Sequence, residues 1–428
     1  MKLRQAKRGL ALAVGMSMVL GMQTTAFAAD DILRVDGKTG KIFVEAQEDG
    51  YNYESKYLYD VSFGYKQDAS TENPTLSHVI QFLSTGRQEG YDARVDLDKF
   101  INSALGKKTA ELWYPHMAWS DDQMDEGLLN YWKNIGLSKE AYYDETEGDE
   151  GITGDYFVYS PVDAKESGKE YPMIVLFHGG GEAAYQVETF GFCQIAASEG
   201  VILVAQEETG DDENTNKIIE AVKEAYPVDS SRIYAVGSSG GGNNSMRFSV
   251  TNLKEIAACA VMDQPVSLAT RWWAAEEENV AEMQEYVLPM VYVGGTADMY
   301  GLHGMQDREF FETSEGAEDQ FISGWNSVMD AFNVSDKTLT AEQRYAYADA
   351  PSNEAELYDG YPFDNVVDVD STGTSPVYKC TMNDTEDLCL YLAVNRAHMP
   401  SGYDAENIWS FISQYKRNLD TGKSERIE

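Results

Sequence analysis

A serine flanked by glycines follows a strand-like run near the middle of the chain. Residues 232–246 read RIYAVGSSGGGNNSM. Ser239 has one glycine two positions before it and another two positions after it, whereas the same spacing around Ser238 finds Val236 in place of a glycine. This G-x-S-x-G pattern is typical of a nucleophilic serine on a sharp turn between a strand and a helix, where larger flanking side chains would clash. Ser239 is therefore the candidate nucleophile, although an ordinary glycine-rich turn has the same composition.

A serine nucleophile needs a base that takes its proton and an acid that orients the base. His398 follows the last predicted strand and precedes the closing helix, and Asp298 follows an earlier strand on a Gly-Gly-Thr-Ala turn. The order Ser239, Asp298, His398 is the order of the triad in α/β-hydrolases. Asp263, which follows another strand, is the rival acid, and His303, five residues after Asp298, is the rival base.

Backbone N–H groups hold the negative oxygen of the tetrahedral intermediate in acyl-transfer enzymes. Gly240 directly follows the candidate nucleophile, and Gly179, Gly180 and Gly181 follow an apolar strand predicted for residues 172–177. Glycine suits both places because the backbone itself must approach the substrate. These four glycines are the predicted oxyanion-hole residues.

After residue 151 the sequence alternates between strand-like and helical patterns, as a parallel sheet covered by helices requires. The expected strands lie at residues 156–160, 172–177, 201–205, 232–236, 257–262, 288–293, 377–381 and 388–394, and the expected helices at 182–198, 214–226, 240–251 and 405–415. Open parallel sheets collect functional residues at the carboxyl ends of their strands, so the predicted triad is expected at one edge. Residues 299–375 interrupt the alternation. They are predicted to form an insertion between acid and base, either a lid over the site or a unit with an aromatic core of its own.

The amino-terminal part of the chain has a different character. In residues 1–29, four cations, an apolar run at 9–22 and small residues at 26–28 have the features of a signal peptide, so the mature protein is expected to be secreted without a membrane anchor. Residues 30–150 carry no catalytic motif and are predicted to be a folded accessory region, with a hairpin at 32–44 and a helix at 124–135. An acidic run at 144–149 marks the expected boundary to a catalytic domain at residues 151–428.

Charge and cysteine content exclude several classes of protein. The chain has 33 basic and 72 acidic residues, a net charge of −39, which makes nucleic acid and anionic membranes poor partners. Four cysteines are too few for a disulfide scaffold. Cys193 and Cys259 lie among apolar residues and are expected to be buried thiols, whereas Cys380 and Cys389 flank a polar turn and could pair. No cofactor or metal site is expected.

The catalytic region resembles a known group of enzymes. The matching segments are LFHGG at 176–180, VDSSRIY at 228–234, GSSGG at 237–241, GTAD at 295–298, AHMP at 397–400 and Ile408-Trp409. They are similar to the secreted esterase branch of the α/β-hydrolases, which includes polyhydroxybutyrate depolymerases, feruloyl esterases and acetylxylan esterases. The resemblance implies an α/β-hydrolase fold and a triad of Ser239, Asp298 and His398. It does not cover residues 30–150, and the chain departs from the pattern in the Asn-Asn that follows the glycines.

These features predict a secreted serine hydrolase that cleaves carboxylic esters, small or polymeric, through an acyl-serine intermediate. A serine peptidase of the prolyl oligopeptidase type shares the triad, although no blade-length repeat of its usual propeller precedes residue 151. A surface-binding protein that has kept the fold without the activity is the third reading, and it would have little reason to keep all three triad residues.

Overall fold

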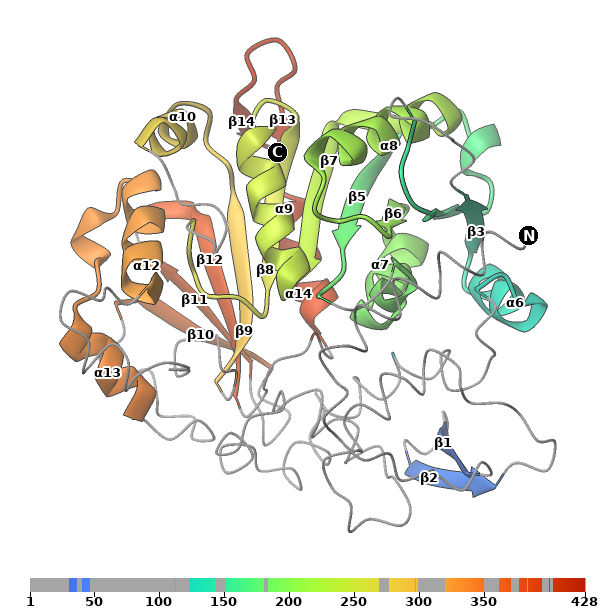
Figure 1. Cartoon of the computed structure of the whole chain (residues 1–428), viewed down its shortest axis with the longest axis horizontal. Coiled ribbons are helices and arrows are strands. Elements are labelled where there is room, and N and C mark those ends of the chain that lie inside the picture. Colours follow the sequence, from blue (N-terminus) through green and yellow to red (C-terminus); the bar gives the residue numbers. More distant parts are fainter. Residues whose placement is uncertain are drawn as a thin grey trace.

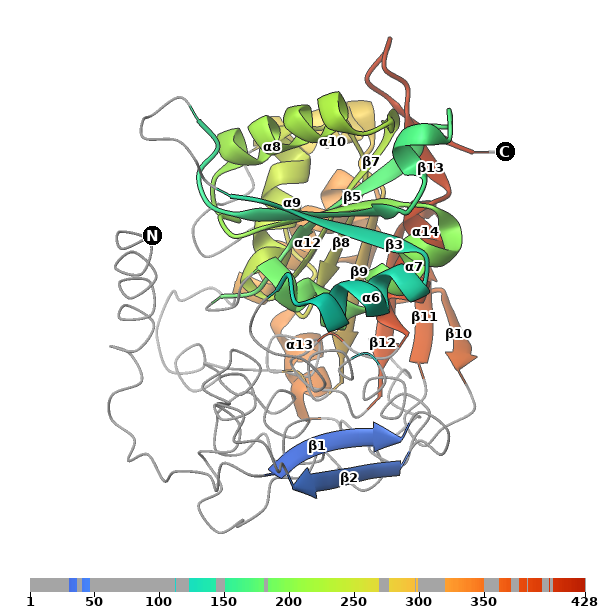
Figure 2. The ribbon, with the colours of Figure 1, turned by 90° about the vertical axis from the view of Figure 1, so that its right-hand side faces the viewer.

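Figures 1 and 2 show the computed structural model of the chain. The structure describes residues 31–36, 41–46, 112, 123–143, 151–180, 184–268, 277–296, 298, 320–349, 362–370, 377–382, 384–394, 400 and 403–427. A separate hairpin, in which β1 (Asp31–Asp36) pairs antiparallel with β2 (Lys41–Ala46), confirms the hairpin predicted at residues 32–44. Among the described residues, no helix is long and apolar enough to cross a membrane.

The core is a sheet of ten strands in the order β10-β11-β12-β9-β8-β7-β5-β6-β4-β3 (Figure 1). The strands are β3 (Leu137–Tyr142), β4 (Tyr156–Pro161), β5 (Tyr171–Phe177), β6 (Ile202–Gln206), β7 (Val228–Ser238), β8 (Ile256–Met262), β9 (Met290–Gly295), β10 (Asn365–Asp370), β11 (Val377–Met382) and β12 (Thr385–Ala393). Neighbouring strands in the central part of the sheet, β12-β9-β8-β7-β5-β6, run parallel. Antiparallel strands flank this part on both sides, β11 and β10 beside β12, and β4 and β3 beside β6. With a serine on the turn after the central strand β7, this is the predicted α/β-hydrolase fold.

Helices cover both faces of the sheet (Figure 2). One face packs against α8 (Asp212–Ala225), α9 (Gly240–Thr251), α10 (Glu277–Tyr286) and α12 (Gln320–Ala331), and the other against α6 (Glu126–Asn134), α7 (Phe192–Glu199) and α14 (Asp404–Ile412). The helix predicted at 182–198 is divided into a 3-10 helix, η3 (Ala184–Phe190), and α7. Gly191 separates them at φ 93°, a conformation that favours glycine.

The sheet begins before residue 151. β3 pairs antiparallel with β4, from Leu137 opposite Pro161 to Tyr142 opposite Tyr156. The preceding helix α6 adds the buried Trp132 to the same core. The boundary predicted at residue 151 therefore falls inside the sheet, because the edge strand LSKEAY has too many polar residues to be recognised as a strand from its own pattern.

An ion pair is buried where β3 meets η3. Lys139 Nζ lies 2.5 Å from Glu188 Oε1, and neither side chain is exposed. The Tyr159 hydroxyl donates to the same carboxylate oxygen, and the ammonium also donates to Gln123 Oε1 at 3.3 Å. A buried charge whose partner is removed is strongly destabilising, so this cluster fixes β3 to η3, which lies just after the glycine loop in the chain.

Lys139→Met is expected to destabilise the fold by about 3–5 kcal/mol, because the Glu188 carboxylate would stay buried without its counter-charge. The double variant Lys139→Met/Glu188→Leu should recover most of that loss, since both charges then leave together. Chemical denaturation measures the free energy of unfolding of each variant.

Lys165→Met is the matched control for this comparison. Its ammonium lies 2.9 Å from Glu140, but the two side chains are 42% and 41% exposed. Exposed pairs contribute only about 0–1 kcal/mol. Equal losses of stability in Lys139→Met and Lys165→Met would contradict a special role for the buried pair.

The predicted insertion at 299–375 contributes to the framework of the domain. β10 lies within it and pairs antiparallel with β11 at the edge of the sheet, whereas the sequence predicts that the sheet resumes only at residue 377. α12 buries Trp325 and Val328 against the sheet, and the Trp325 indole donates to the carbonyl oxygen of Lys337 at 2.8 Å. Trp325 is thus a core residue. Other aromatic residues of the insertion lie outside the described part of the structure: Phe310, Phe311, Tyr358 and Tyr361.

Cys380 and Cys389, which the sequence analysis left open as a possible pair, do not form a disulfide. Both are free, buried thiols on neighbouring strands. Cys380 lies opposite Leu390, and Cys389 lies opposite Thr381, so the two cysteines are offset by one residue in register. Because alternate side chains of a strand point to opposite faces, the thiols belong to the two separate cores of the sheet. Cys193 and Cys259 are buried, as predicted.

The carboxyl terminus forms an additional hairpin that the sequence does not predict, with β13 (Tyr415–Arg417) antiparallel to β14 (Ser424–Arg426). The Arg417 guanidinium is 1% exposed and donates to carbonyl oxygens of Ile256, at the start of β8, and of Tyr286 and Val287. Burial lowers the pKa of Arg417 to about 10. These hydrogen bonds therefore hold the hairpin against the start of β8 and the segment before β9. The starts of these strands lie at the opposite end of the sheet from Ser239.

Candidate active site

Ser239 lies on a sharp turn between β7 and α9. Its backbone has φ 53° and ψ −122°, and among the described residues it is one of four non-glycine residues with positive φ. Its N–H donates to the carbonyl oxygen of Met262 at 3.0 Å, which continues the pairing of β7 with β8 into the turn. Ser239 is partly exposed, whereas Ser238 is buried and donates its hydroxyl to Asp263. Of the two serines, only Ser239 is open to a substrate.

Glycines around the serine allow backbone to pack on backbone. A Cβ on Gly237 would lie 2.1 Å from the carbonyl oxygen of Gly241, and a Cβ on Gly241 would lie 2.1 Å from that of Phe177 and 2.3 Å from that of His178. Real Cβ atoms do not approach oxygen this closely, so a side chain at either glycine would push α9 away from the sheet. The glycines of the G-x-S-x-G pattern are thus needed because the backbones at this turn lie too close for a side chain.

The glycine loop after β5 lies against the start of α9. A Cβ on Gly240 would lie 3.2 Å from the nitrogen of Gly180, so the two backbones are neighbours. The first N–H groups of a helix have no acceptor within the helix, and the positive end of the helix dipole favours a negative oxygen there. Gly180 is exposed and can reach a substrate, and Gly179 is buried beside it. Gly181 lies outside the described residues.

His178 braces this loop, a role that the sequence analysis missed. Its Nδ1 lies 2.8 Å from the carbonyl oxygen of Gly179, and its Nε2 lies 3.0 Å from the carbonyl oxygen of Glu207 at the end of β6. The Glu207 carboxylate accepts a bond from the N–H of Ala184, on the other side of the glycines. The loop is therefore held on both sides. A histidine directly before a glycine triplet is the signal that could have indicated this bracing.

Asp298 and its rival Asp263 both lie at the carboxyl edge of the sheet, after the neighbouring strands β9 and β8, and both are fully buried. The N–H of Asp298 donates to the carbonyl oxygen of Gly295 at 3.1 Å and closes the turn after β9. Asp263 accepts the hydroxyl of Ser238 at 3.0 Å. The structure thus brings Ser239 and Asp298 to the same edge, as predicted from strand order, and gives Asp263 a partner within the serine turn.

The predicted base His398 and its rival His303 lie outside the described residues, so the triad stays a prediction. The cysteines are not alternative nucleophiles, because the thiolate is the reactive form and burial keeps these thiols protonated. Burial raises the pKa of Cys259 and Cys389 to about 12, and the pKa of Cys193 and Cys380 well above the usual value. Within the described ranges, no group of histidine, cysteine and carboxylate side chains is arranged to hold a metal ion.

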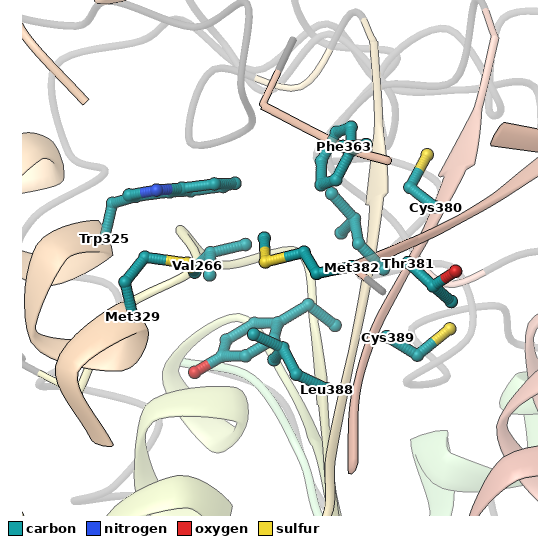
Figure 3. A pocket seen from close by; sticks show the side chains of 11 residues that line it. Val266, Trp325, Met329, Phe363, Cys380, Thr381, Met382, Leu388 and Cys389 are labelled. Atoms are coloured by element: carbon teal, nitrogen blue, oxygen red, sulfur yellow. The ribbon is translucent and has the colours of Figure 1, made fainter. Parts of the chain in front are cut away.

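A cavity between α12 and the sheet is too small to hold an acyl group (Figure 3). Trp325 and Met329 of α12 lie on one side of it, and Phe363 and Met382 lie on the other. Its volume of about 10 Å³ is at the lower limit for one water molecule. The cavity also borders the middle of β12, at Leu388, Cys389 and Leu390. It is a small, mostly apolar gap between side chains of α12 and the sheet, and we assign no substrate to it.

Comparisons with known proteins concern the fold alone. No protein-family model and no curated protein matches the chain. An acetyl xylan esterase from Aspergillus awamori is 13% identical, with a TM-score of 0.39 over 64% of this chain and 99% of that structure. The feruloyl esterase module from Clostridium thermocellum is 15% identical, with a TM-score of 0.31 over 46% and 86%. A fluorophosphonate-binding serine hydrolase from Staphylococcus aureus is 13% identical, with a TM-score of 0.31 over 37% and 78%.

Gly241→Ala is expected to slow ester hydrolysis by about 10²–10³-fold, the loss typical of a displaced oxyanion donor. The new Cβ would overlap the carbonyl oxygens of Phe177 and His178 and push the start of α9 away from the glycine loop. Hydrolysis of p-nitrophenyl acetate measures the rate. Gly210→Ala is the control, because a Cβ there meets no atom within 4 Å. Equal rates in the two variants would show that the turn between β7 and α9 tolerates a side chain at position 241.

Proposed function

We propose that the protein is a carboxylic-ester hydrolase that works through an acyl-serine intermediate on Ser239. The observation that carries this proposal is the backbone of Ser239, held at φ 53° on the turn between β7 and α9 with the side chain partly exposed. Such a conformation costs a non-glycine residue of order 1–3 kcal/mol and is found mainly where function requires it. The closeness of the Gly180 and Gly240 backbones supports the assignment, because their N–H groups are the proposed donors to the oxyanion.

In the proposed reaction, Ser239 Oγ attacks the ester carbonyl carbon while His398 takes the hydroxyl proton and Asp298 orients the imidazole. Backbone N–H groups of Gly240 and of the loop at 179–181 stabilise the oxyanion. The intermediate then expels the alcohol, which leaves with the proton from His398. A water molecule, deprotonated by the same imidazole, attacks the acyl-serine, and the carboxylic acid leaves as Ser239 regains its proton.

The proposed enzyme acts outside the cell, since the first 29 residues have the composition of a signal peptide. The part of the insertion that follows Asp298 is proposed to border the active site. The support is topological: the chain leaves the sheet after β9, at the edge where Ser239 lies.

Ser239→Ala is expected to abolish both ester hydrolysis and labelling by a fluorophosphonate, because the attacking oxygen is gone. Ser238→Ala should still take up one label, at Ser239, as peptide mapping would show. Acetyl, feruloyl, hydroxybutyryl and peptide substrates then separate an esterase from a peptidase. Covalent labelling that persists in Ser239→Ala would overturn the assignment of the nucleophile.

His398→Ala is expected to lower turnover by about 10²–10⁴-fold, the range of general acid–base catalysis, and His303→Ala by much less. Wild-type activity should rise from mildly acidic to neutral pH, because an imidazole with an ordinary pKa of about 6.5 accepts a proton only when it is neutral. Initial rates across pH 5–8 test both statements. A flat pH profile, or a larger loss in His303→Ala, would show that another group is the base.

A further inference from the structure

A buried carboxylate lies next to the residue that precedes the candidate nucleophile. The Ser238 hydroxyl donates to Asp263 Oδ2 at 3.0 Å, and the two residues are 3% and 0% exposed. Little water competes for this bond, so it is electrostatically stronger than the same bond at the surface. A hydrogen bond to a charged acceptor is also stronger than one between neutral groups.

The backbone on each side of this bond is held in an unusual conformation. Asp263 has φ 55° and Ser239 has φ 53°, both in the region that favours glycine. The N–H of Ser239 donates to Met262 at 3.0 Å, and the N–H of Asp263 donates to Val293, near the end of β9, at 2.9 Å. Strained conformations of this kind persist only where the surrounding structure restrains them. The serine turn is thus tied to the end of β8 through one backbone bond and one side-chain bond, and β8 is tied in turn to β9.

We infer that Asp263 is a positioning residue for the reaction, acting through Ser238. Its carboxylate holds the residue before the nucleophile, so that the turn keeps the Ser239 hydroxyl facing the substrate carbonyl and the oxyanion donors. This inference rests on the proposed hydrolase function. It gives Asp263 a role different from that of the predicted acid Asp298, which orients the base.

Loss of a positioning contact has a distinct kinetic signature. A misaligned nucleophile reacts slowly with a substrate that still binds, so kcat falls while KM changes little. From the usual strength of a hydrogen bond to a charged group, kcat should fall by about 10- to 100-fold. A role confined to folding would instead reduce the amount of active enzyme, without changing kcat per active site.

The test compares four variants of the full chain: Ser238→Ala, Asp263→Ala, the double variant, and Asp263→Asn. Active sites are counted by fluorophosphonate titration, so unfolded protein does not enter kcat. Ser238→Ala and Asp263→Ala should each lose about 10- to 100-fold in kcat, and the double variant should lose no more than either, because all three lack the same bond. Asp263→Asn keeps an acceptor oxygen for Ser238 and should stay within a few fold of the wild type.

Two results would overturn the inference. If the loss of kcat in the double variant equals the product of the two single losses, the two residues act independently. A loss of about 10⁴-fold in Asp263→Asn with normal kcat in Ser238→Ala would make Asp263 the acid of the triad, since that loss is typical of a histidine left in the wrong tautomer. Asp298→Asn, measured beside them, identifies which aspartate has that role. A failure of the proposed function itself would be seen separately, because Ser239→Ala would then still be labelled by the fluorophosphonate.

Discussion

The approach of α9 to the carboxyl ends of β5 and β7 is the constraint on which the rest of the site depends. Only glycine at 237 and 241 lets the helix backbone come this close to the strand backbones. That approach brings the first N–H groups of α9 beside the glycine loop, and it leaves Ser239 at the point where the chain must turn. The positive φ of Ser239 follows from this geometry, and the hydrogen bonds to β8 hold it there. The strain in the turn is thus offset by its attachment to a ten-stranded sheet.

The parts of this arrangement that depend on consecutive residues are predictable from the sequence. Strands β5 and β8 are buried on both faces, so each is a continuous apolar run. α9 begins and ends at the predicted residues, Gly240 and Thr251, because the glycines and the strand before them fix its start. The positions of the glycine loop and of Asp298 follow from the same strand ends. No local pattern, however, reports that Ser238 contacts Asp263, because that contact depends on the alignment of two strands.

Features that depend on pairing between distant segments could not be predicted from the sequence, and the reason is physical. β3 and β10 are edge strands, so each has only one neighbour in the sheet, and neither is a continuous apolar run. Val367 in β10 is 54% exposed, and Lys139 in β3 is a buried charge that local patterning assigns to the surface. The sequence could not show whether Cys380 and Cys389 pair, for a related reason. A shift of one residue in the register between β11 and β12 places Cys380 and Cys389 on opposite faces, and a sequence pattern does not specify register that finely.

β3 also determines where the catalytic unit can be cut. A fragment that begins at residue 151, as the motifs alone suggest, would lack the strand that covers the outer side of β4. The freed N–H and C=O groups of β4 would form an open edge, and open edges are templates for association between chains. The same fragment would leave Glu188 buried without its ammonium partner. Truncated protein intended to remain soluble must therefore start before α6, no later than about residue 123, where the described part of this layer begins.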